Sequence, residues 1–174
     1  MLHHLWSGKN LVSKLACVRE MHTEVTKGGI AVGVTVQCKK TGRSLDMGYG
    51  GFNRWRSKIA ELYGGEWWDH YKTIDDAPFL DTRGQRTAFF EAFDRRTLQL
   101  ITEKRADIKI VDFCLQPDSD GSVNYGACKN ILKAIGDYTD NLVYGYAAYA
   151  DHDWDRLKAI LQECVDTKSK LVWS

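Results

Sequence analysis

The chain has 174 residues, of which 44% are hydrophobic and 27% charged, and this composition is typical of a globular domain. Two prolines and the lack of any low-complexity stretch argue against a disordered tail or a hinge linker. The net charge of +1 conceals a division, because residues 1–60 carry +7 and the remainder carries −6. The basic part either faces an anion or, as we favour, pairs with the acidic part, and a dedicated duplex-binding protein would be more basic overall.

The chain in order begins with a short helix predicted over residues 10–25, with Leu11, Leu15 and Val18 on one face. Residues 29–38 alternate apolar and polar side chains, KKTGR follows as a turn, and residues 44–47 return as a partner strand, so 29–48 is predicted as a β-hairpin. Next comes an amphipathic helix. Its apolar stripe consists of Phe52, Trp55, Ile59 and Leu62, and Arg54, Arg56 and Lys58 are expected to point away from it, towards solvent or a partner.

Residues 66–84 read as irregular. Thr82 and Gln85 fit a capping box that opens a long helix running to Ile101, and residues 108–115 are ambiguous between a strand and a helix. Asn124 is the expected N-cap of a helix that ends at Gly136, and a last helix starts at Asp151 or Asp153. The closing KLVWS is an edge strand or a strap.

These elements predict the α+β class, with an N-terminal β-hairpin packed with about four to five helices. We expect residues 1–174 to form a single domain, with 1–25 as a segment that is only loosely attached.

The apolar runs are short. None approaches the roughly 18 residues of a membrane span, and residues 1–10 contain no apolar stretch of signal-peptide length, so we expect a cytoplasmic protein without membrane association.

The five cysteines are odd in number and lack C-x-x-C spacing. We therefore expect reduced, buried thiols rather than a disulfide framework or a zinc finger. Cys128 and Cys164 fall on apolar helical faces, as inert core thiols do.

The segment PDSDG at residues 117–121 could hold a cation or simply turn the chain. With Gly121 at the sixth position of a calcium loop, the twelfth is Ala127 instead of the bidentate glutamate, so Asp118 and Asp120 are weak metal candidates. Each residue of the segment also suits a turn that leads into a helix, which is the reading we favour. No cofactor is expected.

GYGG at residues 48–51 precedes a helix that carries Arg54 and Arg56, and its backbone N–H groups could hold an anion. A plain turn is the favoured alternative. Several aromatic residues outside the helical stripes suit stacking on a planar ligand, a protein interface or a large-residue core. The candidate ligand-binding residues are Tyr49, Arg54, Arg56, Trp67, Trp68, Tyr144 and Tyr146.

Four segments together resemble a family of small proteins from phages and gut-type bacteria that has no established activity. They are SLDMGYGGFNRWRSKIAELY (44–63), SDGSVNYGACKNIL (119–132), DNLVYGYAAYADHDW (140–154) and LQECVDTKSKLVW (161–173). Members of that family often carry S-D-C-D-G before the helix, whereas this chain has D-S-D-G, so a cysteine-centred reaction there is not expected. The resemblance implies a phage or mobile-element origin, and then the host cytoplasm, and supplies no catalytic residue.

Three functions remain open at this stage. The first is a non-enzymatic protein that binds a small anionic or aromatic ligand, for example a nucleotide immune signal sequestered in counter-defence. The second is an interaction module that inhibits a host protein or associates with itself. The third is a metal-dependent hydrolase using Asp118 or Asp120.

Overall fold

The computed structural model describes residues 33–80, 82–145 and 153–174, and the helix expected over 10–25 lies outside them. Four antiparallel strands form one sheet in the order β2-β1-β4-β3. The strands are β1 (Gly33–Cys38), β2 (Ser44–Gly48), β3 (Gly121–Val123) and β4 (Leu171–Trp173). The α+β class is confirmed, and so is the hairpin over residues 33–48, whereas residues 29–32 of the predicted hairpin lie outside the described residues.

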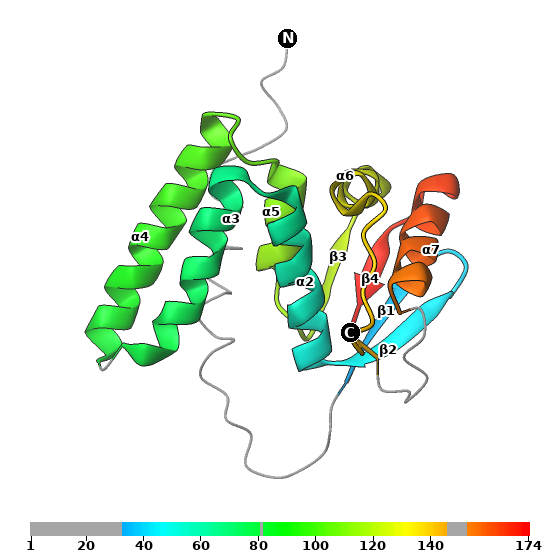
Figure 1. The fold of residues 1–174 in the computed structure, drawn as a ribbon, viewed down its shortest axis with the longest axis horizontal. Helices are drawn as coiled ribbons and strands as arrows, with labels where there is room; N and C mark the ends of the chain where they lie inside the picture. Colours follow the sequence, from blue (N-terminus) through cyan, green and yellow to red (C-terminus); the bar gives the residue numbers. More distant parts are fainter. Residues whose placement is uncertain (1–32, 81, 146–152) are drawn as a thin grey trace.

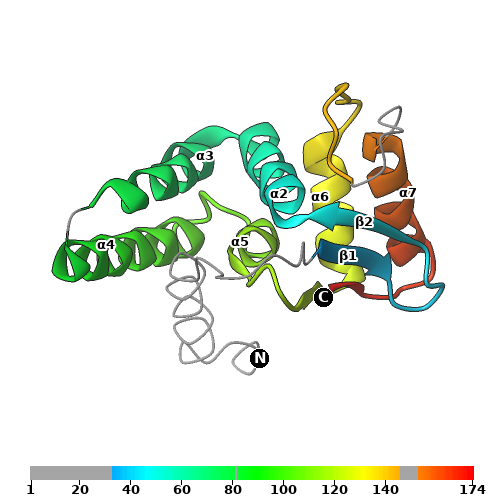
Figure 2. The same ribbon diagram turned by 90° about the horizontal axis from the view of Figure 1, so that it is seen from below.

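The helices of the described residues are α2 (Tyr49–Tyr63), α3 (Gly65–Tyr71), the 3₁₀ helix η2 (Lys72–Phe79), α4 (Arg83–Thr102), α5 (Ile108–Leu115), α6 (Tyr125–Ile135) and α7 (Asp153–Asp166). Helices α2, α6 and α7 lie beside the strands, whereas α3, η2 and α4 extend away from the sheet (Figures 1 and 2). We call α3, η2 and α4 together the helical arm.

The hairpin follows from its alternating pattern. Val34, Val36 and Cys38 of β1 are buried, and the residues between them are partly exposed, so one face of the strand meets the core. The turn is closed by the Cys38 N–H, which donates to the Arg43 carbonyl oxygen at 3.0 Å. Gly42 has a φ of 76°, a conformation that glycine adopts without strain.

An aromatic cluster fills the core between the sheet and helices α2 and α5. Phe52 and Trp55 come from α2, Phe113 from α5 and Trp173 from β4. The ring centroids of Trp55 and Phe113 lie 5.2 Å apart, and those of Phe52 and Trp173 lie 5.4 Å apart. These pairs are tilted or edge-on, which is the arrangement that aromatic rings favour.

The helix ends agree with the sequence signals. Thr82 and Gln85 form both hydrogen bonds of the capping box at the start of α4. The Asn124 side chain accepts the Ala127 N–H at 3.0 Å at the start of α6, and that helix ends at Gly136. Helix α7 begins at Asp153, one of the two predicted starts.

The ambiguous stretch 108–115 is helical, with Asp107 as its N-cap. Two other expectations were wrong. Residues 66–84, read as irregular, contain α3 and η2, because Trp67 and Tyr71 are spaced four apart and bury one helical face. The closing strand is not at an edge, since β4 lies between β1 and β3.

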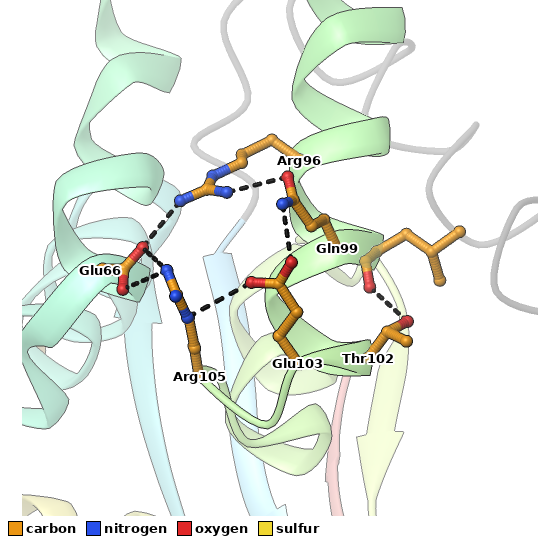
Figure 3. A network of polar contacts seen from close by, with 7 residues as sticks. Glu66, Arg96, Gln99, Thr102, Glu103 and Arg105 are labelled. Atoms are coloured by element: carbon orange, nitrogen blue, oxygen red, sulfur yellow. Dashed lines mark hydrogen bonds and ion pairs between the residues drawn. The ribbon is translucent and has the colours of Figure 1, made fainter.

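Exposed side chains connect α3 to α4 and to the residues that follow α4 (Figure 3). Glu66 of α3 accepts hydrogen bonds from Arg96 at 2.7 Å and from Arg105 at 2.8 Å. Arg105 also contacts Glu103 at 3.3 Å. Such surface pairs contribute about 0–1 kcal/mol each to stability.

Candidate functional site

The PDSDG segment is a turn that is held by hydrogen bonds and by close packing against Trp173. The Trp173 indole N–H donates to the Pro117 carbonyl oxygen at 2.8 Å, and the Gln116 side chain exchanges two 3.0 Å hydrogen bonds with the backbone of Ser122. A Cβ on Gly121 would lie 2.2 Å from the Trp173 ring, so only glycine allows this approach. The segment therefore joins α5 to β3.

Arg56 does not point to solvent, and that expectation was wrong. Its side chain is only 2% exposed, forms an ion pair with Asp118, and donates to the Gln116 carbonyl oxygen at 2.5 Å and to Asn53 at 2.6 Å. Burial lowers the pKa of Arg56 from its usual 12.5. The guanidinium lies 4.6 Å above the Phe52 ring, and so Arg56 connects α2 to the turn.

The metal candidates are placed as follows. Asp118 faces Arg56 and accepts the Asn53 amide at 3.0 Å, whereas Asp120 is exposed. Within residues 33–80, 82–145 and 153–174, no group of three or more His, Cys, Asp or Glu side chains is arranged to hold a metal ion.

The aromatic candidates separate into two neighbourhoods. Trp67 is fully buried and packs on Tyr71 in the arm, with centroids 5.4 Å apart, and Trp68 beside it is partly exposed. Tyr144 is also buried, but it packs on Trp154 of α7, with centroids 5.5 Å apart. Core packing accounts for the rings of Trp67 and Tyr144.

Arg54 and Tyr144 are the candidates that the fold brings together. The Arg54 guanidinium lies 5.9 Å from the centre of the Tyr144 ring and donates to the Val143 carbonyl oxygen at 3.2 Å. Arg54 is exposed and Tyr49 partly exposed. Tyr146 lies outside the described residues.

Two aspartates fix the segment that carries Tyr144. Asp140 accepts the hydroxyl groups of Tyr138 at 2.9 Å and Tyr144 at 2.8 Å, and Asp153 accepts the backbone N–H groups of Tyr144 and Gly145, both at 2.8 Å. Burial opposes ionisation of Asp140, but these hydroxyl donors and the Leu142 N–H outweigh it and lower its pKa. Burial, together with the Asp140 carboxylate, raises the pKa of Tyr144.

A concentration of positive charge lies elsewhere, at the end of the sheet where β1 stops. The turn after β1 runs beside the turn before β4, since the Lys39 N–H donates to the Lys170 carbonyl oxygen at 2.9 Å. All five cationic side chains of these turns are exposed. We call this set the basic corner: Lys39, Lys40, Arg43, Lys168 and Lys170.

Acidic neighbours offset only part of this charge. Glu163 of α7 lies 3.9 Å from Arg43, and Asp166 accepts the Gln162 amide at 2.7 Å. The sequence shows KKTGR and TKSK as two separate basic turns. It does not show that β1 and β4 pair, which is what joins them, and so the basic corner could not be found before the strand order was known.

Among the described residues, none of the helices combines the length and hydropathy that a bilayer crossing requires. Comparisons of the chain with protein-family models, curated proteins and solved structures give no match.

Proposed function

We propose that this protein binds a phosphate-bearing anionic ligand at the basic corner. The observation that carries the proposal is the adjacency of the two basic turns, given by the 2.9 Å backbone hydrogen bond from the Lys39 N–H to the Lys170 carbonyl oxygen. A bound polyanion would offset the positive charge that these exposed side chains concentrate at one end of the sheet.

The chemistry of the corner favours phosphate over a single carboxylate. Ammonium groups are compact point charges with rotatable donors, and Arg43 can add a bidentate contact to phosphate oxygens. Exposed cations on two turns suit a ligand that carries two or more phosphates, such as a cyclic dinucleotide or a nucleoside polyphosphate. We further propose a nucleotide immune signal as the ligand, sequestered in counter-defence, which keeps the first of the three functions that the sequence left open.

Calorimetry at low and at high salt tests this proposal, with a panel of cyclic dinucleotides and adenosine polyphosphates as probes. We expect at least one probe to release heat on binding. Its affinity should fall about tenfold or more in Lys39→Glu/Lys170→Glu, because both substitutions replace a cation with an anion, and tenfold corresponds to about 1.4 kcal/mol. Binding should also weaken at high salt.

The matched control is Arg83→Glu/Arg95→Glu on α4 of the helical arm, which changes the net charge by the same amount away from the corner. This control should bind as the unmodified protein does. An equal loss of affinity in both double variants would show a general charge effect, and an absence of heat from every probe at low salt would also overturn the proposal.

A further inference from the structure

The two faces of the sheet carry different side chains. Alternate residues of β1, β2 and β4 are buried in the core, so the residues between them lie on the opposite face and are partly or fully exposed. We call this opposite side the outer face of the sheet. The residues of these three strands that define it are Thr35, Gln37, Ser44, Asp46 and Val172.

The strand register places the outer face directly beside the basic corner. Lys39 and Lys170 lie opposite each other, since the Lys39 N–H donates to the Lys170 carbonyl oxygen at 2.9 Å. Two residues earlier in β1, Gln37 lies opposite Val172 of β4 on one side and Ser44 of β2 on the other. Residues two apart along a strand are about 7 Å apart and point the same way. The Gln37 side chain is therefore a neighbour of the corner on the outer face.

The charge of the outer face changes along the strands. Next to Gln37, on the side away from the corner, Thr35 lies opposite Asp46, and its hydroxyl donates to that exposed carboxylate at 2.6 Å. The face is thus cationic at the corner, neutral around Gln37 and anionic at Asp46. A ligand with phosphates at one end and an uncharged ring system at the other matches this order in one direction only, with its phosphates at the corner.

The chemistry of Gln37 suits one kind of base. Its amide offers an acceptor and two donors side by side, and this pattern complements the N6 donor and N7 acceptor of adenine. Guanine presents two acceptors, O6 and N7, on the same edge, and the carbonyl oxygen of a glutamine amide cannot donate to either of them. Val172 opposite Gln37 is apolar and partly exposed, so it can contact the plane of a base.

We propose that a nucleotide bound at the basic corner places its base on the outer face of the sheet, where Gln37 selects adenine over guanine. The phosphates contact Lys39 and Lys170, the ring contacts Val172, and the Gln37 amide exchanges two hydrogen bonds with the adenine edge. This inference rests on the proposed function, because it requires phosphates at the corner. It adds the identity of the base.

Probes that differ only in the base test this inference. The pairs are cyclic diadenylate with cyclic diguanylate and ATP with GTP, and calorimetry at low salt gives the ratio of the two dissociation constants in each pair. We expect the unmodified protein to bind the adenine member at least about fivefold more tightly in one pair or both, as a bidentate glutamine contact provides. Both members of a pair carry the same charges, so the ratio cancels the contribution of the phosphates.

Variants assign the preference to Gln37. Gln37→Ala should lower the ratio to about one, and Gln37→Arg should reverse it, because arginine offers two donors to guanine O6 and N7. The matched control Gln99→Ala removes an exposed glutamine from α4 of the helical arm and should keep the ratio of the unmodified protein. Thermal unfolding verifies that the variants fold, and the ratio in the unmodified protein needs no variant.

The outcomes separate this inference from the proposed function. Suppose that the unmodified protein shows no preference for adenine while Lys39→Glu/Lys170→Glu still weakens binding of both members. Selection by Gln37 would then be refuted and the basic corner would stand. An adenine preference that survives in Gln37→Ala would refute the selection as well. An absence of binding by every probe would overturn both proposals.

Discussion

At the scale of single residues, Arg56 stands out as a charged side chain that is buried in the core. It is a buried cation held by the Asp118 carboxylate, the Gln116 carbonyl oxygen and Asn53. Taking a charge out of water costs several kcal/mol, and only a set of partners of this quality offsets that cost. Removing the cation leaves the Gln116 carbonyl oxygen without this donor, and it leaves the Asp118 carboxylate with the Asn53 amide but no positive charge.

Arg56→Ala should therefore lower the free energy of unfolding by about 3–5 kcal/mol, the usual result of breaking a buried pair from one side. Urea denaturation followed by tryptophan fluorescence measures it. Arg54→Ala is the control from the same helix, and its exposed side chain should contribute no more than about 1 kcal/mol. Equal losses in the two variants would contradict the assignment.

The sequence does indicate that Arg56 lies close to the buried face of the helix, although the apolar stripe does not include it. Arg56 follows Phe52 by four positions, so it lies at the margin of the buried helical face rather than opposite to it. Its partner could not be predicted, because Asp118 is 62 positions further along the chain and reaches Arg56 only through the α5–β3 turn. Tyr144 was likewise unassignable, since its position depends on α7.

At the scale of elements, the helical arm depends on a polar contact inside an aromatic layer. His70 of α3 stacks on Phe93 of α4 with centroids 4.1 Å apart. Its Nε2 lies 2.9 Å from Thr97 Oγ1 and 3.1 Å from the Phe93 carbonyl oxygen. Burial lowers the pKa of His70, the Phe93 carbonyl partly opposes this, and Arg96 adds to it.

This shift fixes the direction of a pH dependence. The folded pKa of His70 is below its ordinary 6.5, so the unfolded chain binds the proton more readily. The contribution of the neutral His70 to the free energy of unfolding is present above about pH 6.5. It is lost as the pH falls from there towards the lower folded pKa.

His70→Phe should keep the stacking on Phe93 and remove this titration. We expect urea denaturation between about pH 8 and about pH 5 to show a smaller loss of stability in the variant than in the unmodified protein. In this variant the Thr97 hydroxyl can instead donate to a backbone carbonyl oxygen one helical turn earlier in α4. Coincident pH profiles would show that His70 contributes nothing to the acid sensitivity.

How well an element could be predicted depended on how many signals agreed. At α4 the capping box and a long apolar stripe pointed the same way, and the helix begins where expected. At α3 the pair Gly64–Gly65 reads as the end of a helix, and α3 has only seven residues before η2, so the periodicity is too short to stand out. For α5 an eight-residue apolar run suits either structure, and Asp107 as an N-cap decides for the helix.

At the scale of the whole molecule, the fold depends on its last strand. β4 pairs with β1 on one side and with β3 on the other, and it contributes the fully buried Leu171 and Trp173 to the core. The sequence suggested an edge strand or a strap there and did not indicate its neighbours, because pairing partners are a property of the assembled sheet and no local pattern encodes them.

Deleting residues 171–174 should remove cooperative unfolding altogether. Losing a buried leucine and a buried tryptophan costs about 5–10 kcal/mol together, which is comparable to the total stability of about 5–15 kcal/mol of a domain. Near-ultraviolet circular dichroism and a thermal scan measure the effect. Deleting Ser174 alone removes one hydrogen bond, from Thr35 N–H at 3.0 Å, and should leave a native spectrum and a cooperative transition.

The central position of β4 also determines when the sheet can be completed during translation. Domains assemble from the N-terminus as the ribosome delivers about 5–20 residues per second, but here β1 and β3 must wait for Leu171–Trp173 before they are joined. Until then the edges of both strands and the face of Phe52 that meets Trp173 lack their covering. This protein therefore completes its sheet only after translation has passed residue 173, and its most aggregation-prone interval falls immediately before that point.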